Sequence, residues 1–465
     1  MASIGSEQAS RSWRVSRLVD AQSIVGRGLA LFTGTGDLSL VRRLAGTAFI
    51  LRIVAALLAF LSQIVLARWL GSYQFGIYVY AWTWLLLIGG ISDLGLGSAA
   101  QRFVPEYGEL KQLALLRGFV RGSPWLALVI SSAIASVAIG IIAITPLGNS
   151  ESFLPLCFAC AALPAYAVAS VLSGVARSYN WINLGLAPTY VLRHIILMAL
   201  MAAIYFVGLP MNAVTTMVAT FITIWSCTLG QLFALNRRLG TTIERGPKAY
   251  APRTWLSTAM PISLVEGFYV LVTYSDVIVL TQFRPPEEVA TYYAAAKILA
   301  LVAFIYFAVA QTVAHKFTEI HVSGDRNRLA DFMAHAIRMT FWPSLALIVV
   351  FLVLGEPLLR MYGRDFVGGY PLMFVIAIGL LARAAVGPVE RLLNMLGERR
   401  RCAQVYAGSF LLNLLLCLLL ITHFGAMGAA IASAGTLVFE SICLFLVAKF
   451  RLGIHCLIFG RPKDC

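Results

Sequence analysis

The sequence predicts an all-α polytopic membrane protein with twelve transmembrane helices in two lobes of six, and composition is the first observation behind this class. Of its 465 residues, 60% are hydrophobic and only 12% are charged, and the mean hydropathy is +0.83. Soluble domains carry about 25% charged residues. A water-soluble enzyme or a disordered chain is therefore excluded, because neither could keep this much apolar surface in water.

The second observation is the length of the apolar stretches. A helix needs about 20 apolar residues to cross a bilayer, whereas barrel strands are about ten residues long and alternate. The stretches that qualify as helices are 45–67, 76–100, 123–145, 153–176, 184–206, 212–235, 255–281, 290–314, 337–358, 369–390, 403–422 and 425–448. They divide the chain into a basic tail (1–43), an N-lobe (44–235), a linker (236–254), a C-lobe (255–450) and a C-terminal tail (451–465).

The third observation is the distribution of positive charge over the loops. An even number of spans places both termini on one side of the membrane, and that side carries 28 of the 36 Lys and Arg residues. Only four lie on the opposite side, namely Arg68, Arg284, Arg360 and Arg364. Cytoplasmic loops are enriched in Lys and Arg, so both termini are predicted to be cytoplasmic. This bias also accounts for the net charge of +15 without a nucleic-acid partner.

The two halves of the chain are weakly similar to each other. An offset of 214 residues aligns 70–78 with 284–292, so that Gln74 falls on Glu288 and Tyr78 on Tyr292. Two halves of six spans insert with the same orientation, and we expect an axis along the membrane normal to relate them, with a central cavity between them.

No motif for a nucleotide, a metal ion, another cofactor or a catalytic centre is present. The sequence lacks a GxxxxGK[ST] loop, and its six histidines are dispersed. We therefore expect no cofactor, no metal site and no enzymatic activity. Any transport must then be driven by an ion gradient, the membrane potential or the substrate gradient.

Four cations inside the predicted spans are the candidate substrate-binding residues of the central cavity: Arg52, Arg193, Lys297 and Arg383. A charge at mid-helix costs at least about 2.5–3.5 kcal/mol, so such residues are functional candidates by default. Alternatives remain for three of them. Arg52 could extend to the headgroups or pair with Glu266, Lys297 could be an interface anchor, and Arg383 could form a structural ion pair. Four cations favour an anionic substrate.

Three acidic residues are candidates for ion coupling or gating: Asp93, Glu266 and Asp276. A carboxyl group buried in a membrane helix can carry a coupling proton, and Asp276 is the clearest case. The alternative for Asp276 is an ion pair with Lys297 that holds two spans together. Asp93 precedes a Gly-rich stretch that could act as a hinge. Tryptophans such as Trp82 could stack on sugars or belong to an aromatic belt at the interface.

Residues 66–78, with Gly71-Ser72-Tyr73-Gln74-Phe75-Gly76, lead to Asp93-Leu94-Gly95-Leu96 and then to 102–107, Arg-Phe-Val-Pro-Glu-Tyr. This pattern resembles the first hairpin of polysaccharide flippases (O-antigen or exopolysaccharide type) of the multidrug/oligosaccharidyl-lipid/polysaccharide exporter superfamily. Residues 276–297 resemble the matching hairpin of the second half, and 362–366 resemble the loop before span 10. The resemblance implies a V-shaped, MATE-like architecture and alternating access.

The resemblance further implies that the protein flips an undecaprenyl-pyrophosphate-linked oligosaccharide to the outer leaflet of a bacterial inner membrane, for surface polysaccharide biosynthesis. Its partners would be this glycan, the lipid bilayer, and a polysaccharide polymerase and glycosyltransferases. The alternative is a cation-coupled drug or metabolite exporter of the same fold. A membrane-bound glycan polymerase or ligase is disfavoured, because the predicted outer loops have about ten residues or fewer.

Overall fold

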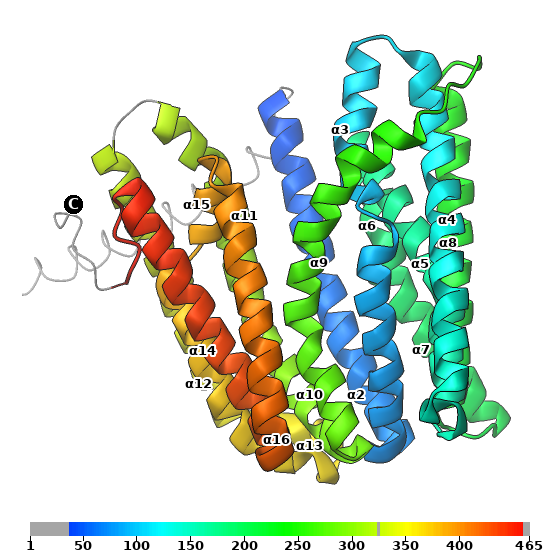
Figure 1. The fold of residues 1–465 in the computed structure, drawn as a ribbon, viewed down its shortest axis with the longest axis vertical. Helices are drawn as coiled ribbons and strands as arrows, with labels where there is room; N and C mark the ends of the chain where they lie inside the picture. Colours follow the sequence, from blue (N-terminus) through cyan, green and yellow to red (C-terminus); the bar gives the residue numbers. More distant parts are fainter. Residues whose placement is uncertain (1–36, 323–325, 459–465) are drawn as a thin grey trace, which may run out of the picture. The chain divides into compact units, whose positions relative to one another are not determined.

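The computed structural model describes residues 37–322 and 326–458, and this part of the chain is built of helices and loops without a strand (Figure 1). The elements are α2 (Asp37–Ser92), α3 (Leu96–Glu109), α4 (Leu113–Ile144), η1 (Pro146–Asn149), α5 (Phe153–Ser178), α6 (Ile182–Ala187), η2 (Pro188–Leu192), α7 (Arg193–Val207), α8 (Ala213–Thr242), α9 (Pro252–Phe283), α10 (Pro286–Ala300), α11 (Ala303–Val322), α12 (Arg326–Val353), α13 (Gly355–Tyr362), η3 (Arg364–Gly369), α14 (Tyr370–Val386), α15 (Val389–Met395) and α16 (Arg399–Leu452).

Most of the predicted N-terminal tail, residues 1–36, lies outside the described residues, as do residues 459–465 of the C-terminal tail. The chain divides into two compact units at Val54, and the packing below is that of the unit from Ala55 onward. The predicted lobe boundaries stay a prediction. We refer to residues 55–235 as the N-terminal half and to residues 255–450 as the C-terminal half.

Nine helical segments of the described chain are long and apolar enough to cross a membrane, and the bent helix α9 makes a tenth. The all-α polytopic class is confirmed, because only helices and closed barrels satisfy their backbone polar groups in lipid. Two of the nine segments contain a break. Gly71 in α2 and Gly425 in α16 have non-helical backbone with φ of 74° and 56°. Both breaks fall at predicted outer turns, and the number of twelve spans stays a prediction.

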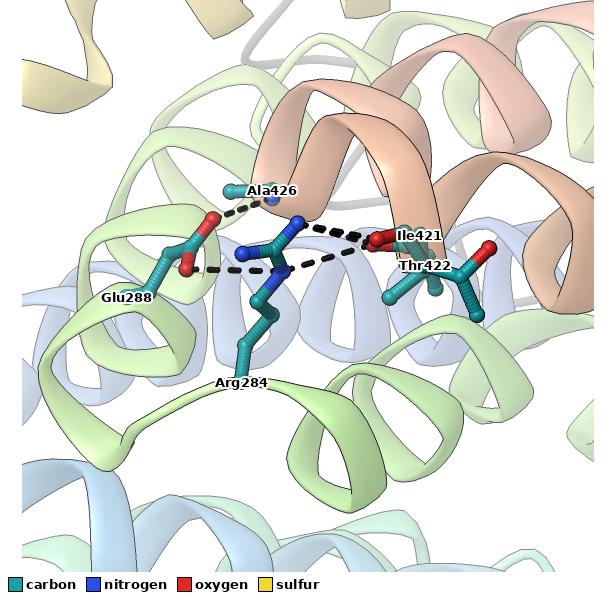
Figure 2. A network of polar contacts seen from close by, with 5 residues as sticks. All are labelled: Arg284, Glu288, Ile421, Thr422 and Ala426. Carbon is teal, nitrogen blue, oxygen red and sulfur yellow. Dashed lines mark hydrogen bonds and ion pairs between the residues drawn. The ribbon is translucent and has the colours of Figure 1, made fainter.

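The break in α16 is held by two side chains from the turn between α9 and α10 (Figure 2). Arg284 donates hydrogen bonds to the carbonyl oxygens of Ile421 at 3.3 Å and Thr422 at 3.2 Å, just before the break. Glu288 accepts one from the backbone N–H of Ala426 at 2.6 Å, just after it. A cation thus lies at a helix C-terminus and a carboxylate at a helix N-terminus, where the backbone dipoles favour each charge.

The N-terminal half contains an equivalent contact. Gln74, which the 214-residue offset places on Glu288, accepts a hydrogen bond from the backbone N–H of Ala213 at 2.9 Å. Ala213 begins α8, as Ala426 begins the second part of α16. In both halves, a polar side chain near the start of the second span therefore caps the N-terminus of the sixth predicted span.

The buried core is shared between the halves at one end and separate at the other. The largest hydrophobic cluster contains residues of both halves, including Phe75 and Phe366. A second cluster belongs to the N-terminal half, with Trp255 and Ala259 of α9 packed onto it. A third contains only residues of the C-terminal half and the segment that follows it. By the predicted topology the shared core lies toward the outer side.

The halves approach most closely where α2 meets the start of α10. A Cβ atom added at Gly76 would lie 1.9 Å from the carbonyl oxygen of Pro286, so only glycine permits this separation. Next to it, the Phe75 ring contacts those of Tyr293 and Phe366 edge-on, with centroids 6.2 and 5.9 Å apart. This aromatic contact and the glycine hold the halves together near the outer side.

We expect Gly76→Ala to destabilise the protein by about 1–3 kcal/mol, because the added methyl group overpacks the contact with Pro286. Thermal unfolding of the purified protein in detergent measures this. Gly140→Ala in α4 is the matched control, since its Cβ would meet no atom within 4 Å. Equal melting temperatures for the two variants would contradict the assigned contact.

Candidate functional site

Arg193 lies at the start of α7, directly after the π-helical turn η2. Insertions of this kind are frequent at functional sites, because they shift the direction of the following side chains. The Arg193 guanidinium lies over the Trp82 ring, 5.1 Å from its centroid, and the side chain is half-buried. Arg193 is thus held on an aromatic face and remains accessible.

Lys297, near the end of α10, has a similar environment in the C-terminal half. Its ammonium nitrogen lies 4.9 Å from the centroid of the Tyr293 ring and 5.9 Å from that of Tyr274. The side chain is half-buried. A cation over an aromatic face gains about 0.5–2 kcal/mol, which offsets part of the cost of its burial.

The structure brings Arg193 and Lys297 to the same aromatic group. Trp82 interacts with Tyr293, and the charge of Arg193 also acts on the Tyr293 phenol. We call Trp82, Arg193, Tyr293 and Lys297 the cation–aromatic site. In the described part of the chain, no carboxylate lies within 4.0 Å of either cation. Two accessible positive charges without a counter-ion can bind an anion such as a phosphate.

Arg383 is arranged differently, because its charge is already paired. Its guanidinium lies 3.7 Å from the carboxylate of Glu440, whose side chain is only 3% exposed. It also lies over the Tyr306 ring at 5.0 Å, and the Tyr306 hydroxyl donates a hydrogen bond to Glu390. Of the two interpretations open for Arg383, the structure displays the ion pair.

Arg52 is exposed on α2 and belongs to the unit that ends at Val54. The structure therefore does not bring Arg52 together with the other three cations. Its predicted pairing with Glu266, and its predicted place in a central cavity, stay predictions.

Asp276 is 9% exposed and forms the centre of a hydrogen-bond network in the C-terminal half. Its Oδ2 accepts hydrogen bonds from the hydroxyl of Tyr292 and, at 2.9 Å, from that of Ser433. The network thereby joins α9, α10 and α16. Asp276 forms no ion pair with Lys297 at 4.0 Å or less, although the charge of Lys297 acts on it.

Asp93 lies in the turn between α2 and α3, where Leu94 and Gly95 have φ of 47° and 74°. Its carboxylate accepts hydrogen bonds from the backbone N–H groups of Gly95 at 3.0 Å and Gly97 at 3.2 Å, and from the Ser170 hydroxyl at 2.8 Å. Asp93 therefore stabilises a break in the second predicted span and fastens it to α5.

Glu266 accepts a hydrogen bond from the hydroxyl of Ser98 at 2.7 Å, and this contact joins α9 to α3 in the other half. The two parts of α9, Pro252–Leu264 and Glu266–Phe283, are bent by 41° relative to each other. Glu266 thus begins the part of α9 that follows the bend.

Sequence reasoning missed the aromatic partners that define the cation–aromatic site. Tyr293 and Trp82 lie in different halves, about 200 residues apart, and no local pattern indicates their contact. It also missed the buried contact between Ser62 and His194, at 3.1 Å. The alignment of Tyr78 with Tyr292 was a usable signal: Tyr292 bonds to Ser433, while Tyr78 interacts with Thr220 at the corresponding place.

The fold and the site define a class: a multi-pass membrane protein with the fold of membrane transporters. The structure is similar to that of the lipid II flippase MurJ in an inward closed conformation, with a TM-score of 0.70, 15% identity and 87% coverage of each chain. It is also similar to a multidrug resistance MATE family transporter in its inward-facing conformation, with a TM-score of 0.69, 15% identity and coverage of 92% and 98%. A transporter of this superfamily from Pyrococcus furiosus matches with a TM-score of 0.65, 16% identity and the same coverage.

The sequence identifies the particular family. Residues 43–315 match the family model described as polysaccharide biosynthesis protein, and the chain belongs to this family. The predicted membership of the multidrug/oligosaccharidyl-lipid/polysaccharide exporter superfamily is thereby confirmed. A search of curated proteins found no match. Within the described residues, no three His, Cys, Asp or Glu side chains are arranged to hold a metal ion.

We expect Arg383→Ala to lower the free energy of unfolding by about 3–5 kcal/mol, because it leaves the buried Glu440 carboxylate without a counter-charge. Thermal unfolding measures the loss. The double variant Arg383→Met, Glu440→Leu should recover most of the stability, since it removes both charges together. A single variant as stable as the parent would show that the ion pair does not stabilise the protein.

Proposed function

We propose that this protein is a secondary transporter that flips a polyprenyl-pyrophosphate-linked oligosaccharide from the cytoplasmic to the outer leaflet of a bacterial inner membrane. The observation that carries the proposal is the cation–aromatic site, which places one unpaired cation from each half beside shared aromatic rings. A pyrophosphate group matches these charges, and aromatic faces can stack on sugars. Membership of a polysaccharide biosynthesis family supports the class of cargo.

The proposed mechanism is alternating access between the two halves. The cores are joined toward the predicted outer side and separate toward the predicted cytoplasmic side, which suits a state open to the cytoplasm. The anionic headgroup would bind Arg193 and Lys297 while the prenyl chain stays in lipid. Opening at the outer side would then require the contact of Gly76 with Pro286 to separate.

Asp276 is the proposed ion-coupling residue. Its carboxylate is tied to Tyr292 and Ser433, and the charge of Lys297 acts on it. A proton or cation that reaches Asp276 would change both the network and the field at Lys297, which would link coupling to headgroup binding. Asp93 and Glu266 are proposed to control the break in the second predicted span and the contact between halves.

We further propose that both termini are cytoplasmic, that Arg52 lines the central cavity and that Arg383 lies at its edge. Glycosyltransferases would supply the lipid-linked glycan, and a polymerase would take it up at the outer leaflet. The similarity to multidrug transporters supports an alternative, a cation-coupled drug exporter. Two unpaired cations disfavour a cationic drug as cargo. Efflux of a cytotoxic cation without a surface-glycan defect in a deletion strain would establish the alternative instead.

Arg193→Ala and Lys297→Ala should each reduce flipping by about tenfold or more, because each removes a charge-assisted contact with the headgroup. Flipping of a fluorescent lipid-linked oligosaccharide in proteoliposomes measures this, with membrane insertion checked in parallel. Arg193→Lys should retain part of the activity. Arg253→Ala, at an exposed loop position, is the control. Full flipping by the alanine variants would remove these residues from the site.

Asp276→Asn should abolish the dependence of flipping on an imposed pH gradient more strongly than it weakens glycan binding. Asparagine keeps an oxygen that accepts from Tyr292 and Ser433 but cannot take up a proton. The initial rate of flipping across a range of pH gradients tests this. Glu109→Gln, which changes an exposed carboxylate, should leave the dependence intact. If Asp276→Asn behaves like the parent, Asp276 has only a structural role.

A further inference from the structure

Three of the four basic residues predicted to lie on the outer side converge on one pocket. Only four of the 36 Lys and Arg residues fall on that side by the predicted topology. Arg68 comes from the first break region of α2, whereas Arg360 and Arg364 lie about 290 residues later, in α13 and η3, and all three line the same pocket. The fourth, Arg284, is occupied at the break in α16.

The pocket is large enough for a headgroup and lies between the two halves. It has a volume of about 950 Å³, and its lining includes Gly71 and Ser72 of one half and Tyr362 and Phe366 of the other. Tyr362 and Phe366 are fully buried and provide a rigid apolar floor. Small-molecule pockets in proteins typically have volumes of about 300–1,000 Å³.

The positive charge in the pocket is only partly neutralised. Arg68 donates to the carbonyl oxygens of Met361 at 2.7 Å and Arg360 at 3.3 Å, which are uncharged acceptors. Arg364 is exposed and has no ion-pair partner in the described part of the chain. The single carboxylate of the lining, Asp365, accepts a hydrogen bond from Ser72 at 3.3 Å, and Arg360 pairs with Glu356 outside the lining.

We propose that this pocket is an anion site for a phosphate group at the outer face of the membrane. Three guanidinium groups around one carboxylate favour a multiply charged oxyanion, because guanidinium matches phosphate geometry with paired N–H donors. The phosphate can come from the diphosphate headgroup of a lipid-linked cargo, an assignment that rests on the proposed function, or from an anionic phospholipid of the outer leaflet.

The position of Arg68 gives binding a consequence. The same guanidinium that would contact the phosphate now joins the two halves through the carbonyl oxygens of α13. A phosphate would compete with these carbonyls, since a charged acceptor forms the stronger hydrogen bond. Occupancy of the pocket therefore weakens a contact between the halves on the outer side.

Binding distinguishes this proposal from the proposed function. In nanodiscs of zwitterionic lipid, with Arg193→Ala in the background to remove the central site, we expect titration calorimetry to detect inorganic pyrophosphate. Arg364→Gln should weaken that binding by about tenfold, and Arg364→Lys by less. Arg253→Gln is the charge-matched control on the other predicted side. In nanodiscs that contain phosphatidylglycerol, native mass spectrometry should show retained anionic lipid if the outer leaflet is the source.

Loss on Arg364→Gln of pyrophosphate binding, or of retained phosphatidylglycerol, supports the site and identifies the source of the phosphate. The proposal is overturned if neither ligand binds in the Arg193→Ala background, or if Arg364→Gln and Arg360→Gln bind both as the parent does. A failure of flipping in Arg193→Ala has no bearing on either result, so the two proposals can fail separately.

Discussion

Two positive charges, Arg193 and Lys297, must be kept in membrane-spanning helices without a carboxylate within ion-pair distance, and the surrounding structure depends on this constraint. Each charge lies over an aromatic ring, at 5.1 Å from Trp82 and 4.9 Å from Tyr293. The rings partly replace the hydration that burial removes, but they leave the charge uncompensated. Arg383 shows the contrast: its pairing with Glu440 neutralises its charge and makes it a structural residue.

The internal repeat explains how the two cations come to face the same aromatic residues. Gln74 and Glu288 cap the sixth predicted spans of their halves through the backbone of Ala213 and Ala426. Both halves therefore fix their second and sixth spans by the same device. They differ where Asp276 corresponds to Ser62 by the 214-residue offset. Only the C-terminal half thus has a buried carboxylate at this position, which gives the two halves different chemistry on a shared framework.

The outer end combines adhesion with charge. Gly76 and Phe75 bring the halves into contact, while Arg68 joins them through carbonyl oxygens of α13. Neutral acceptors leave the Arg68 charge available, so the contact is a weak one that an anion can replace. At the other end the cores are separate. Such an arrangement can open on one side without unfolding either half.

The sequence by itself determined the class, the positions of the spans and the charged residues to consider. Apolar length and loop charge carry this information locally, since a helix in lipid satisfies its own backbone and its orientation follows the nearby Lys and Arg residues. Even the helix breaks at Gly71 and Gly425 fell at predicted turns. The lobe boundaries and the number of twelve spans remain predictions of that reasoning.

Only the tertiary structure decided which charges are paired. From the sequence, Arg383 and Arg193 looked alike, as arginines within apolar helices. Glu440 lies 57 residues from Arg383, and Tyr293 lies 100 residues from Arg193, so their proximity depends on packing between helices. The convergence of Arg68 with Arg364 was likewise hidden, because it requires the two halves to meet. A hydropathy pattern records how one helix faces lipid, but it contains no information on which side chains of distant helices share a space.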